Sequence, residues 1–365
     1  MNKTEYGELS AFHPGYYIAE IIEDMGITQE EFAVRMGTTA KTLSKLVNGQ
    51  INLSNDLAMK LSIMMGTSVE VWLNLQKNYD RKIIEIEGRK DIDGQIQISR
   101  LIDYSYFVKV AHLKETRKPQ EKVENLCGYF KISDLKTLEN QDYLVNFRTG
   151  IKNVDNKNVI NARAWLQTAL NIGGKLQTEE FNARKLMAFL PEIRSMTVQN
   201  PEVFLPRLRK IFSESGIAFV LLPHLKNSGI NGAVKWYTNS TVLLAVNDRR
   251  CYADTFWFTL FHEIKHALQQ KRKVTFVYLD EHEADEKNRQ LEDEADAFAQ
   301  DYLIPAKELA AWSPDKYVSD ADICMFARKI GIHPGIVAGR LQNEGIIPQN
   351  RCTGLKEKYK ITLLP

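Results

Sequence analysis

The sequence predicts a mainly helical α+β protein that folds as more than one domain. Apolar residues recur at helical spacing along most of the chain, and short β-rich runs are confined to residues 217–246. With 365 residues and 44% hydrophobic content, the chain has enough material for two or three domains. We expect an N-terminal helical domain over residues 1–80, a helical linker or middle region over 81–170, and a second domain over 171–365.

The N-terminal domain is expected to contain five short helices, because separate apolar stripes recur at helical spacing between residues 13 and 79. Thr28 is placed to cap the helix that begins at Gln29, and Gly37 is placed to end it. A further short helix over residues 40–48 stops before Gly49, which gives a helix, a tight turn and a helix. In this arrangement the second helix can enter the major groove of DNA.

That second helix has a polar face without any acidic residue. Its hydroxyls, amide and lysines can contact phosphates and base edges, whereas its apolar residues face the core. The expected DNA-contacting residues are Thr39, Lys41, Thr42, Ser44, Lys45 and Asn48. This prediction rests on the local motif, because a net charge of +2 does not by itself indicate a nucleic-acid partner.

The span from His13-Pro14-Gly15 through Trp72-Leu73-Asn74-Leu75-Gln76 to Tyr79-Asp80 resembles the HigA-type antitoxin and repressor helix-turn-helix family. The resemblance covers about a fifth of the chain and implies a five-helix lambda-repressor-like fold. It also implies operator DNA as a partner and a homodimer as the binding form.

In the second domain, the most informative motif is His262-Glu263-Ile264-Lys265-His266. Residues four apart lie on one face of an α-helix, so the two imidazoles can reach one metal ion with Glu263 beside them. Apolar residues recur at helical spacing through the same segment, which predicts a buried stripe and turns the histidines toward another side. This is the arrangement that zinc hydrolases use.

A catalytic zinc ion needs a third protein ligand, and the helical stretch 291–303 offers Glu292 and Glu294. These two glutamates are two residues apart and point in different directions on the helix, so only one of them is expected to reach the ion. Glu292 has Asp296 four residues later on its own face, where a carboxylate can accept the free ring N–H of a zinc-bound histidine. We therefore predict Glu292 as the ligand and Asp296 as the partner of a histidine.

The run Glu292-Asp293-Glu294-Ala295-Asp296-Ala297-Phe298-Ala299, followed by Leu303-Ile304-Pro305, resembles the ImmA/IrrE family of zinc metallopeptidases, as does Phe256-Trp257-Phe258-Thr259-Leu260-Phe261. The resemblance spans about residues 175–358 and implies a zincin-like fold, zinc ligands at His262, His266 and Glu292, and a general base at Glu263. Relatives usually have glycine where this chain has Lys265, a cation that could alter water acidity or substrate preference.

If the site is active, zinc lowers the pKa of bound water toward about 7, and Glu263 takes the proton and later returns it to the leaving amine. A second donor for the oxyanion is left open among Tyr278, His282 and Tyr302. The expected Glu263→Gln variant keeps zinc and loses proteolysis.

Three β-rich runs precede the metal-binding helix, at residues 217–222, 233–237 and 241–246. Residues 233–237 are the candidate edge strand that could hold an extended substrate, although an ordinary structural strand is an equal alternative. Residues 320–342 repeat a helix, glycine stop and helix, which we interpret as an ordinary helical part of the second domain rather than a second DNA contact.

Four widely spaced cysteines without C-x-x-C spacing, and no signal peptide or long apolar span, predict a cytoplasmic protein without a membrane partner. The leading hypothesis is a DNA-binding regulator or antitoxin with a zinc-dependent peptidase domain that acts on a protein substrate, such as another repressor. The alternative is a non-proteolytic antitoxin or repressor with a structural or sensory zinc site. A toxin bound by the middle region is a third possibility.

Overall fold

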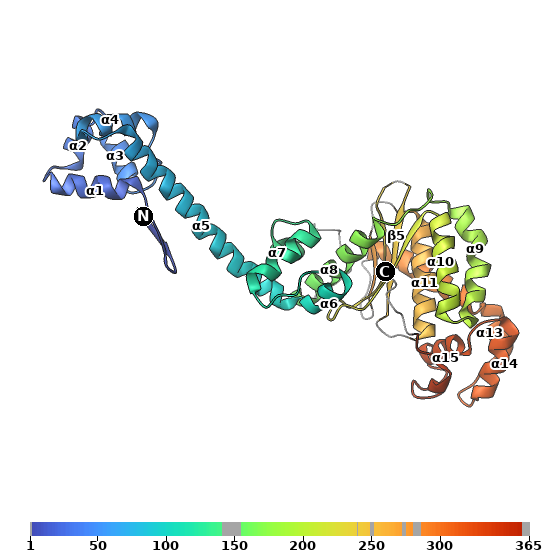
Figure 1. The fold of residues 1–365 in the computed structure, drawn as a ribbon. Coiled ribbons are helices and arrows are strands. Elements are labelled where there is room, and N and C mark those ends of the chain that lie inside the picture. The colour runs from blue at the N-terminus through green and yellow to red at the C-terminus, as the bar shows by residue number, and fades with distance from the viewer. Residues whose placement is uncertain are drawn as a thin grey trace. The chain divides into compact units, whose positions relative to one another are not determined.

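The computed structural model describes residues 2–140, 155–238, 240–248, 252–271, 275–279 and 286–359. The chain divides into two compact units, Met1–Gln97 and Ile98–Pro365, whose elements are labelled in Figure 1. Helices predominate and the sheets are small, so the predicted α+β class is confirmed. The finer division at residues 80 and 170 stays a prediction.

The first unit is a helical bundle preceded by a hairpin. Its core comes from apolar residues of the first five helices, including Ile18, Phe32, Leu43 and Leu61. The Thr28 side chain accepts a hydrogen bond from the backbone N–H of Glu31, as the expected cap requires. The elements are β1 (Lys3–Tyr6), β2 (Leu9–Phe12), α1 (Pro14–Asp24), α2 (Gln29–Arg35), α3 (Ala40–Val47), α4 (Asn55–Met65) and α5 (Val69–Leu101).

The fifth helix is not short, contrary to the expectation from sequence. Helix α5 has 33 residues and runs without a break through the charge-rich residues 81–94. Two glycines at positions 88 and 94 do not end it, because neither adopts a positive φ. Residues 81–94 are therefore helical.

The second unit is built on a mixed four-stranded sheet with the order β3-β5-β4-β6. Strand β5 pairs in parallel with β3 and antiparallel with β4, and β4 pairs antiparallel with β6. The strands are β3 (Ile217–Leu222), β4 (Ile230–Trp236), β5 (Val242–Asn247) and β6 (Phe276–Leu279). The three β-rich runs seen in the sequence correspond to β3, β4 and β5.

The prediction that residues 233–237 form an edge strand is wrong. Strand β4 has β5 on one side and β6 on the other, so its backbone groups are paired on both sides. The edge next to β4 is β6, a four-residue strand that follows the helix with His262 and His266 in the chain. A strand this short carries little periodicity, and its pairing with β4 is not local in sequence.

Helices cover both faces of this sheet. Helices α10 (Pro201–Glu214) and α11 (Ala253–Gln269) pack on the face that carries Phe219 and Leu244. Helix α8 (Asn156–Gly173) packs on the other face, where Gly173 lies against Val220 and Leu243. Coverage on both sides explains why β3 and β5 are buried along their whole length and do not alternate between buried and exposed residues.

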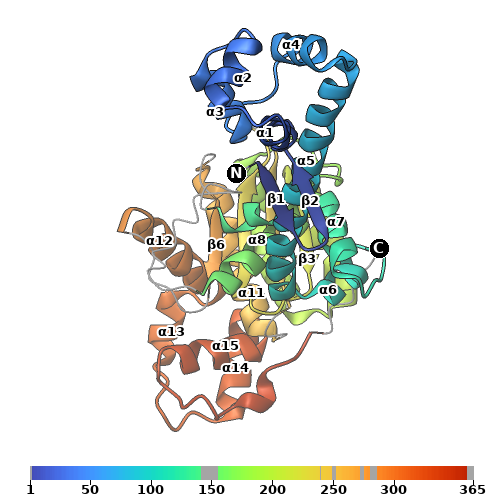
Figure 2. The ribbon, with the colours of Figure 1, turned by 90° about the vertical axis from the view of Figure 1, so that its left-hand side faces the viewer.

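The part of the chain before α8 joins the second unit. Tyr106, which precedes α8, donates a hydrogen bond to the carbonyl of Pro223 directly after β3, and Trp165 of α8 donates to the same carbonyl. Figure 2 shows the later helices α13 to α15 together at one end of the same unit. The remaining elements are α6 (Tyr104–Val110), α7 (Pro119–Phe130), η1 (Leu135–Glu139), α9 (Ala183–Ser195), η2 (Met196–Val198), α12 (Glu286–Leu303), α13 (Ala306–Trp312), α14 (Asp320–Ile330), α15 (Pro334–Asn343) and η3 (Thr353–Leu355).

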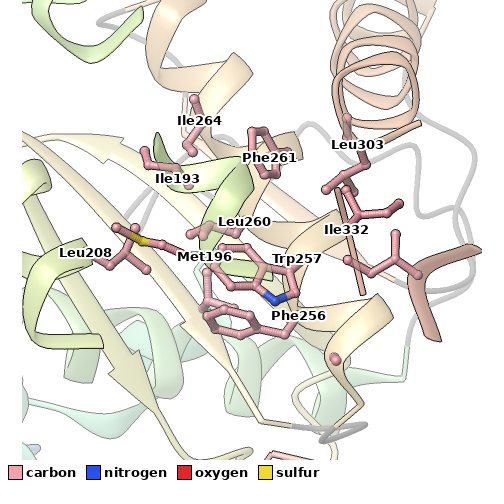
Figure 3. Packing of buried hydrophobic residues seen from close by; sticks show 14 of the residues in the cluster. Ile193, Met196, Leu208, Phe256, Trp257, Leu260, Phe261, Ile264, Leu303 and Ile332 are labelled. Carbon is pink, nitrogen blue, oxygen red and sulfur yellow. The ribbon is translucent and has the colours of Figure 1, made fainter. Parts of the chain in front are cut away.

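The main core lies along α11. The α11 residues Trp257, Leu260, Phe261 and Ile264 are fully buried, and Figure 3 shows them among side chains from other helices, such as Leu208. The indole N–H of Trp257 donates to the Tyr359 hydroxyl at 2.8 Å. This apolar stripe fixes the rotation of α11 and so decides where its remaining face points.

In the described part of the chain, none of the helices is both long enough and apolar enough to cross a membrane.

Candidate metal centre and DNA-reading helix

The face of α11 opposite its core stripe carries the two histidines of the motif. His262 and His266 lie one turn apart and are almost completely buried between α11 and α12. Their Nε2 atoms are 2.9 Å apart, and the Glu292 Oε2 atom from α12 is 3.2 Å from His262 Nε2 and 3.3 Å from His266 Nε2. Three potential ligand atoms from two helices therefore converge on one point.

These distances fit a tetrahedral zinc ion. Zinc–nitrogen bonds of about 2.0–2.1 Å and tetrahedral angles separate neighbouring ligand atoms by about 3.3 Å. The two imidazoles and one carboxylate also match the donor set of catalytic zinc sites, which leave one position for water. The residues present are therefore able to hold the ion that the sequence predicts.

Each histidine is oriented by a second hydrogen bond. His262 Nδ1 lies 2.8 Å from Asp296 Oδ1, on the carboxylate that the sequence placed one turn after Glu292. His266 Nδ1 lies 2.9 Å from Gln269 Oε1, and the Gln269 amide donates to the Leu291 carbonyl of α12 at 2.9 Å. Partners on Nδ1 leave Nε2 of both rings for the ion.

Sequence reasoning missed Gln269. Its position three residues after His266 on the same helix is within reach of the ring, which is the signal that could have found it.

Glu294 lies away from the converging atoms, although the sequence offered it as an alternative ligand. Its carboxylate is 3.6 Å from Lys265 Nζ and 3.3 Å from the Gln269 amide. Lys265 also lies over the Phe298 ring, 5.9 Å from its centroid. Lys265 therefore contacts the flank of α12 through Glu294 and Phe298.

Glu263 occupies an enclosed position between α11 and β4. Its side chain is fully buried, and neither carboxylate oxygen has a hydrogen-bond partner in the described structure. A Cβ atom on Gly232 of β4 would lie 2.5 Å from Glu263 Oε1, so only glycine leaves room for this carboxylate. A glycine inside a strand is a sequence sign of such a close approach.

Burial and neighbouring charges shift the ionisation of the cluster. Burial raises the pKa of Glu263 to about 8, with opposing effects from His262 and Glu292. Burial would raise the pKa of Glu292, but hydrogen bonds from His262 and His266 lower it to about 2. Burial would lower the pKa of His262, but Asp296 and Glu292 raise it to about 9. The ligand carboxylate is thus charged, as a metal site requires.

The three proposed oxyanion donors have different outcomes in the structure. The Tyr302 ring stacks on Phe261 at 5.3 Å, on the core side of α11, and so does not face the cluster. The backbone of Tyr278 is part of β6, whereas His282 lies outside the described residues. The second donor stays open between these two residues.

In the first unit, α3 is the helix that the sequence assigns to DNA. Leu43, Leu46 and Val47 are buried in the core, and Thr39, Lys41, Lys45 and Asn48 are exposed. Gly15 at the start of α1 packs against the carbonyl of Leu46, where a Cβ atom would come within 2.0 Å. This contact fixes α3 against α1 with its polar face outward.

Some of the predicted DNA contacts have local roles. The Thr39 hydroxyl accepts from the backbone N–H of Thr42 at 3.1 Å and caps α3, and the two threonine hydroxyls are 2.9 Å apart. The Asn48 amide donates to the Ser44 carbonyl at 2.8 Å. Lys41 and Lys45 form no ion pair with the described residues, so their charges are available to phosphates.

The second helix-turn-helix pattern, α14 to α15, is not available to DNA. Most of α15 is buried against α11 and the segment that contains η3, including Ile336, Val337 and Leu341. This agrees with its interpretation as an ordinary helical part of the second unit.

Two family models match these two regions. Residues 18–72 match the helix-turn-helix family, and residues 220–342 match the IrrE N-terminal-like domain. The HTH-type transcriptional regulator YddM of Escherichia coli is 34% identical over 79 residues, which are 22% of this chain and 82% of YddM. The chain belongs to the helix-turn-helix family of transcriptional regulators. It joins that N-terminal domain to an IrrE-like, metallopeptidase-like C-terminal domain.

Other relatives match the N-terminal domain. Antitoxin HigA-1 of Vibrio cholerae is 41% identical over 61 residues, which are 17% of this chain and 57% of that antitoxin. An addiction module antidote protein of a HigA family from Coxiella burnetii, a solved structure, is 28% identical, with a TM-score of 0.22; the match covers 23% of this chain and 92% of that one. The resemblance predicted from the sequence is confirmed at both ends of the chain.

Proposed function

We propose that the protein is an operator-binding regulator or antitoxin whose second unit is a zinc-dependent peptidase. The observation that carries the proposal is the convergence of His262, His266 and Glu292, with the carboxylate of Glu263 on the next position of α11. The substrate we propose is a protein, such as another repressor bound at the same operator. The regulator binds DNA as a homodimer.

The residues divide the chemistry between them. Zinc held by the three side chains would supply a Lewis acid that acidifies water and polarises a peptide carbonyl. In its ionised form, Glu263 accepts the proton of the attacking water and returns it to the leaving amine. Its enclosure against Gly232 holds the carboxylate in place and excludes bulk water. Asp296 and Gln269 hold the two imidazoles in the tautomer that leaves Nε2 unprotonated.

The peptidase function is tested by incubating the purified full chain with DNA-binding proteins encoded beside its gene, with and without a chelator. We expect cleavage that the chelator abolishes and that Glu263→Gln loses by at least about 10²-fold while zinc stays bound. Glu292→Gln is expected to lose zinc as well, whereas the matched variant Glu294→Gln keeps both zinc and cleavage. Cleavage by Glu263→Gln at the wild-type rate would contradict the mechanism.

The same experiment addresses the alternative function. A protein that binds zinc stoichiometrically but cleaves none of its neighbouring regulators is an antitoxin or repressor with a structural or sensory zinc site. A toxin encoded beside the gene and co-purifying with the protein would identify the partner in that case.

Operator binding is tested with the DNA upstream of the protein's own gene. We expect Lys41→Ala with Lys45→Ala to weaken binding on the order of tenfold or more and to lower the slope of log K against log salt by about 2, because two phosphate contacts are lost. The control removes two exposed charges from α5, Lys77→Ala with Arg81→Ala. An effect of equal size in the control would contradict the assignment of α3 as the DNA-reading helix.

A further inference from the structure

A cavity of about 310 Å³ lies beside the metal cluster, with walls from α11, α12 and α15. Its volume is at the lower end of the range of about 300–1,000 Å³ that small-ligand sites occupy. Thr259 lines it one helical turn before Glu263, and Asp296 lines it while binding His262. A side chain that enters the cavity would therefore lie next to a peptide bond held at the cluster.

The charged side chains that line the cavity are already paired. The pairs are Asp254 with Lys356 at 2.7 Å, Asp296 with His262 at 2.8 Å, and Arg340 with Glu344 at 2.5 Å. A charged group that entered the cavity would lose its water and find no unpaired counter-charge, which is unfavourable. The cavity is therefore expected to take an uncharged group.

A buried donor and a buried acceptor of the cavity residues lack a hydrogen-bond partner among the described residues. The donor is Nη1 of Arg340 on α15, and the acceptor is Oδ1 of Asp254 on α11. The two side chains are only 17% and 12% exposed, and both line the cavity. Because buried polar groups are normally paired, this combination indicates a ligand that supplies an acceptor and a donor together.

A carboxamide meets these conditions. Its oxygen accepts hydrogen bonds, its nitrogen donates them, and the group carries no charge. Phe258, Leu303 and Ile336 give the same cavity an apolar surface on which a short methylene stem can lie. Asparagine and glutamine combine such a stem with a carboxamide. A carboxylate of the same shape would bring a like charge toward Asp254 and could not donate to it.

We propose that this cavity binds the side-chain carboxamide of an asparagine or glutamine of the protein substrate, next to the peptide bond that is cut. Arg340 Nη1 donates to the amide oxygen, and the amide nitrogen donates to Asp254 Oδ1. The inference rests on the proposed peptidase function and deepens it by naming the substrate class. A site built on such hydrogen bonds rejects an isostere that leaves its buried groups unpaired, so glutamate should be selected against.

The first experiment uses peptides made by cutting a bacterial proteome after lysine and arginine, so that asparagine and glutamine remain inside them. The zinc-loaded full chain is incubated with these peptides, and the cut positions are identified by mass spectrometry. We expect at least about a tenfold excess of asparagine and glutamine at one position beside the cut. Two synthetic peptides that carry glutamine or glutamate at that position then give the glutamine-to-glutamate ratio of kcat/KM, which should also be at least about tenfold.

Two variants change the cavity without replacing a metal ligand. Arg340→Lys keeps the positive charge opposite Glu344 but has no Nη1, so we expect it to lower the glutamine-to-glutamate ratio at least about tenfold. Asp254→Asn leaves Lys356 without its counter-ion, so the preference should move toward glutamate by a similar factor. The control is Arg328→Lys, which makes the same exchange on the exposed face of α14 and should keep the ratio.

Zinc content is expected to stay the same in all three variants, which shows that the cluster is intact. Cleavage without an excess of asparagine and glutamine, or a glutamine-to-glutamate ratio that either cavity variant leaves unchanged, would overturn this proposal and leave the peptidase function standing.

A second measurement separates the cavity from the catalysis. If the wild-type chain cuts no peptide, the peptidase function fails, and binding of acetyl-glutamine methylamide and acetyl-glutamate methylamide is measured by calorimetry. These compounds share their main-chain amides and differ only in the side chain, so the comparison reports on the carboxamide. Tighter binding of the glutamine compound that Arg340→Lys weakens at least about tenfold would support the site. Equal binding of the two compounds, or none, would overturn it.

Discussion

Gly232 is the residue on which the position of the proposed general base depends. It lies in β4 at an irregularity in the pairing with β6, directly against the carboxylate of Glu263. A methyl group at this position would overlap Oε1 and press on the Cγ and Cδ atoms of the glutamate at 2.8 and 2.9 Å. The glutamate would have to move, because β4 is hydrogen-bonded to β5 on one side and to β6 on the other and so cannot easily shift.

Gly232→Ala is therefore expected to lower kcat on the order of 10- to 100-fold, because a displacement of about 1 Å at a catalytic group can cost 10²-fold. Zinc content should not change, since the three atoms nearest to an added Cβ all belong to Glu263 and none belongs to a ligand residue. The measurement compares kcat, KM and zinc stoichiometry with those of Gly128→Ala, where an added Cβ meets open space. A Gly232→Ala enzyme with the kcat of Gly128→Ala would refute this role.

Among single residues, the sequence predicted the site residues whose relative positions are set by one helix. It missed the residues whose contacts depend on packing between different elements. His262 and His266 are one turn apart, as are Glu292 and Asp296, so helical geometry alone gives each pair a common face. The choice between Glu292 and Glu294 required their different directions on α12 and the position of Asp296 on the face of Glu292. Gly232 could not be assigned to Glu263, because the contact depends on how α11 lies across β4.

Among the elements, α12 is held at its C-terminal end by a single side chain from α9. The Arg194 guanidinium donates to the carbonyls of Tyr302 and Leu303 at 2.8 and 2.9 Å, and to that of Ile330 at the end of α14 at 2.9 Å. Helix ends leave carbonyls without partners inside the helix, and a cation there also interacts favourably with the helix dipole. Arg194 thus joins three helices, one of which carries Glu292 and Asp296.

We expect Arg194→Met to lower the free energy of unfolding of the second unit by about 2–4 kcal/mol, because buried carbonyls lose their donors. Arg194→Lys should recover only part of this loss, since an ammonium group cannot make the same fork of bonds. Chemical denaturation followed by tryptophan fluorescence measures both, and zinc titration shows whether α12 has shifted. If Arg194→Lys had the same free energy of unfolding as the wild-type chain, the positive charge alone would explain the stabilisation, and the several hydrogen bonds of the guanidinium would not be needed.

Helices and their ends were predictable because their causes are local, whereas sheet positions were not. The N-terminal cap at Thr28 and the stop at Gly37 follow from single residues. The edge position of β6 depends on pairing between β4 and a strand that follows α11, which no local pattern reveals. The uniform burial of β3 and β5 similarly depends on α8, most of which lies in the region that the sequence described only as a helical linker or middle region.

For the molecule as a whole, one chain carries the proposed DNA-reading helix and the candidate metal cluster in two units. Helix α5 runs from the first unit into the second without interruption. Because one polypeptide connects the two units, binding by one unit makes a later encounter of the other unit with a partner on the same DNA intramolecular. The proposed operator binding by α3 would therefore raise the effective concentration of the cluster toward any protein bound on the same DNA.

This predicts that cleavage of a neighbouring repressor is faster when both proteins bind one DNA molecule than when they bind separate molecules. At nanomolar protein the gain is expected to be on the order of 10²-fold, because tethered effective concentrations reach the millimolar range when both sites can be engaged together. The measurement compares initial cleavage rates on DNA carrying both sites with rates on an equimolar mixture of the two separate sites. Lys41→Ala with Lys45→Ala should remove the difference while leaving cleavage of free repressor unchanged. Equal rates on joined and separate sites would show that the two units act independently.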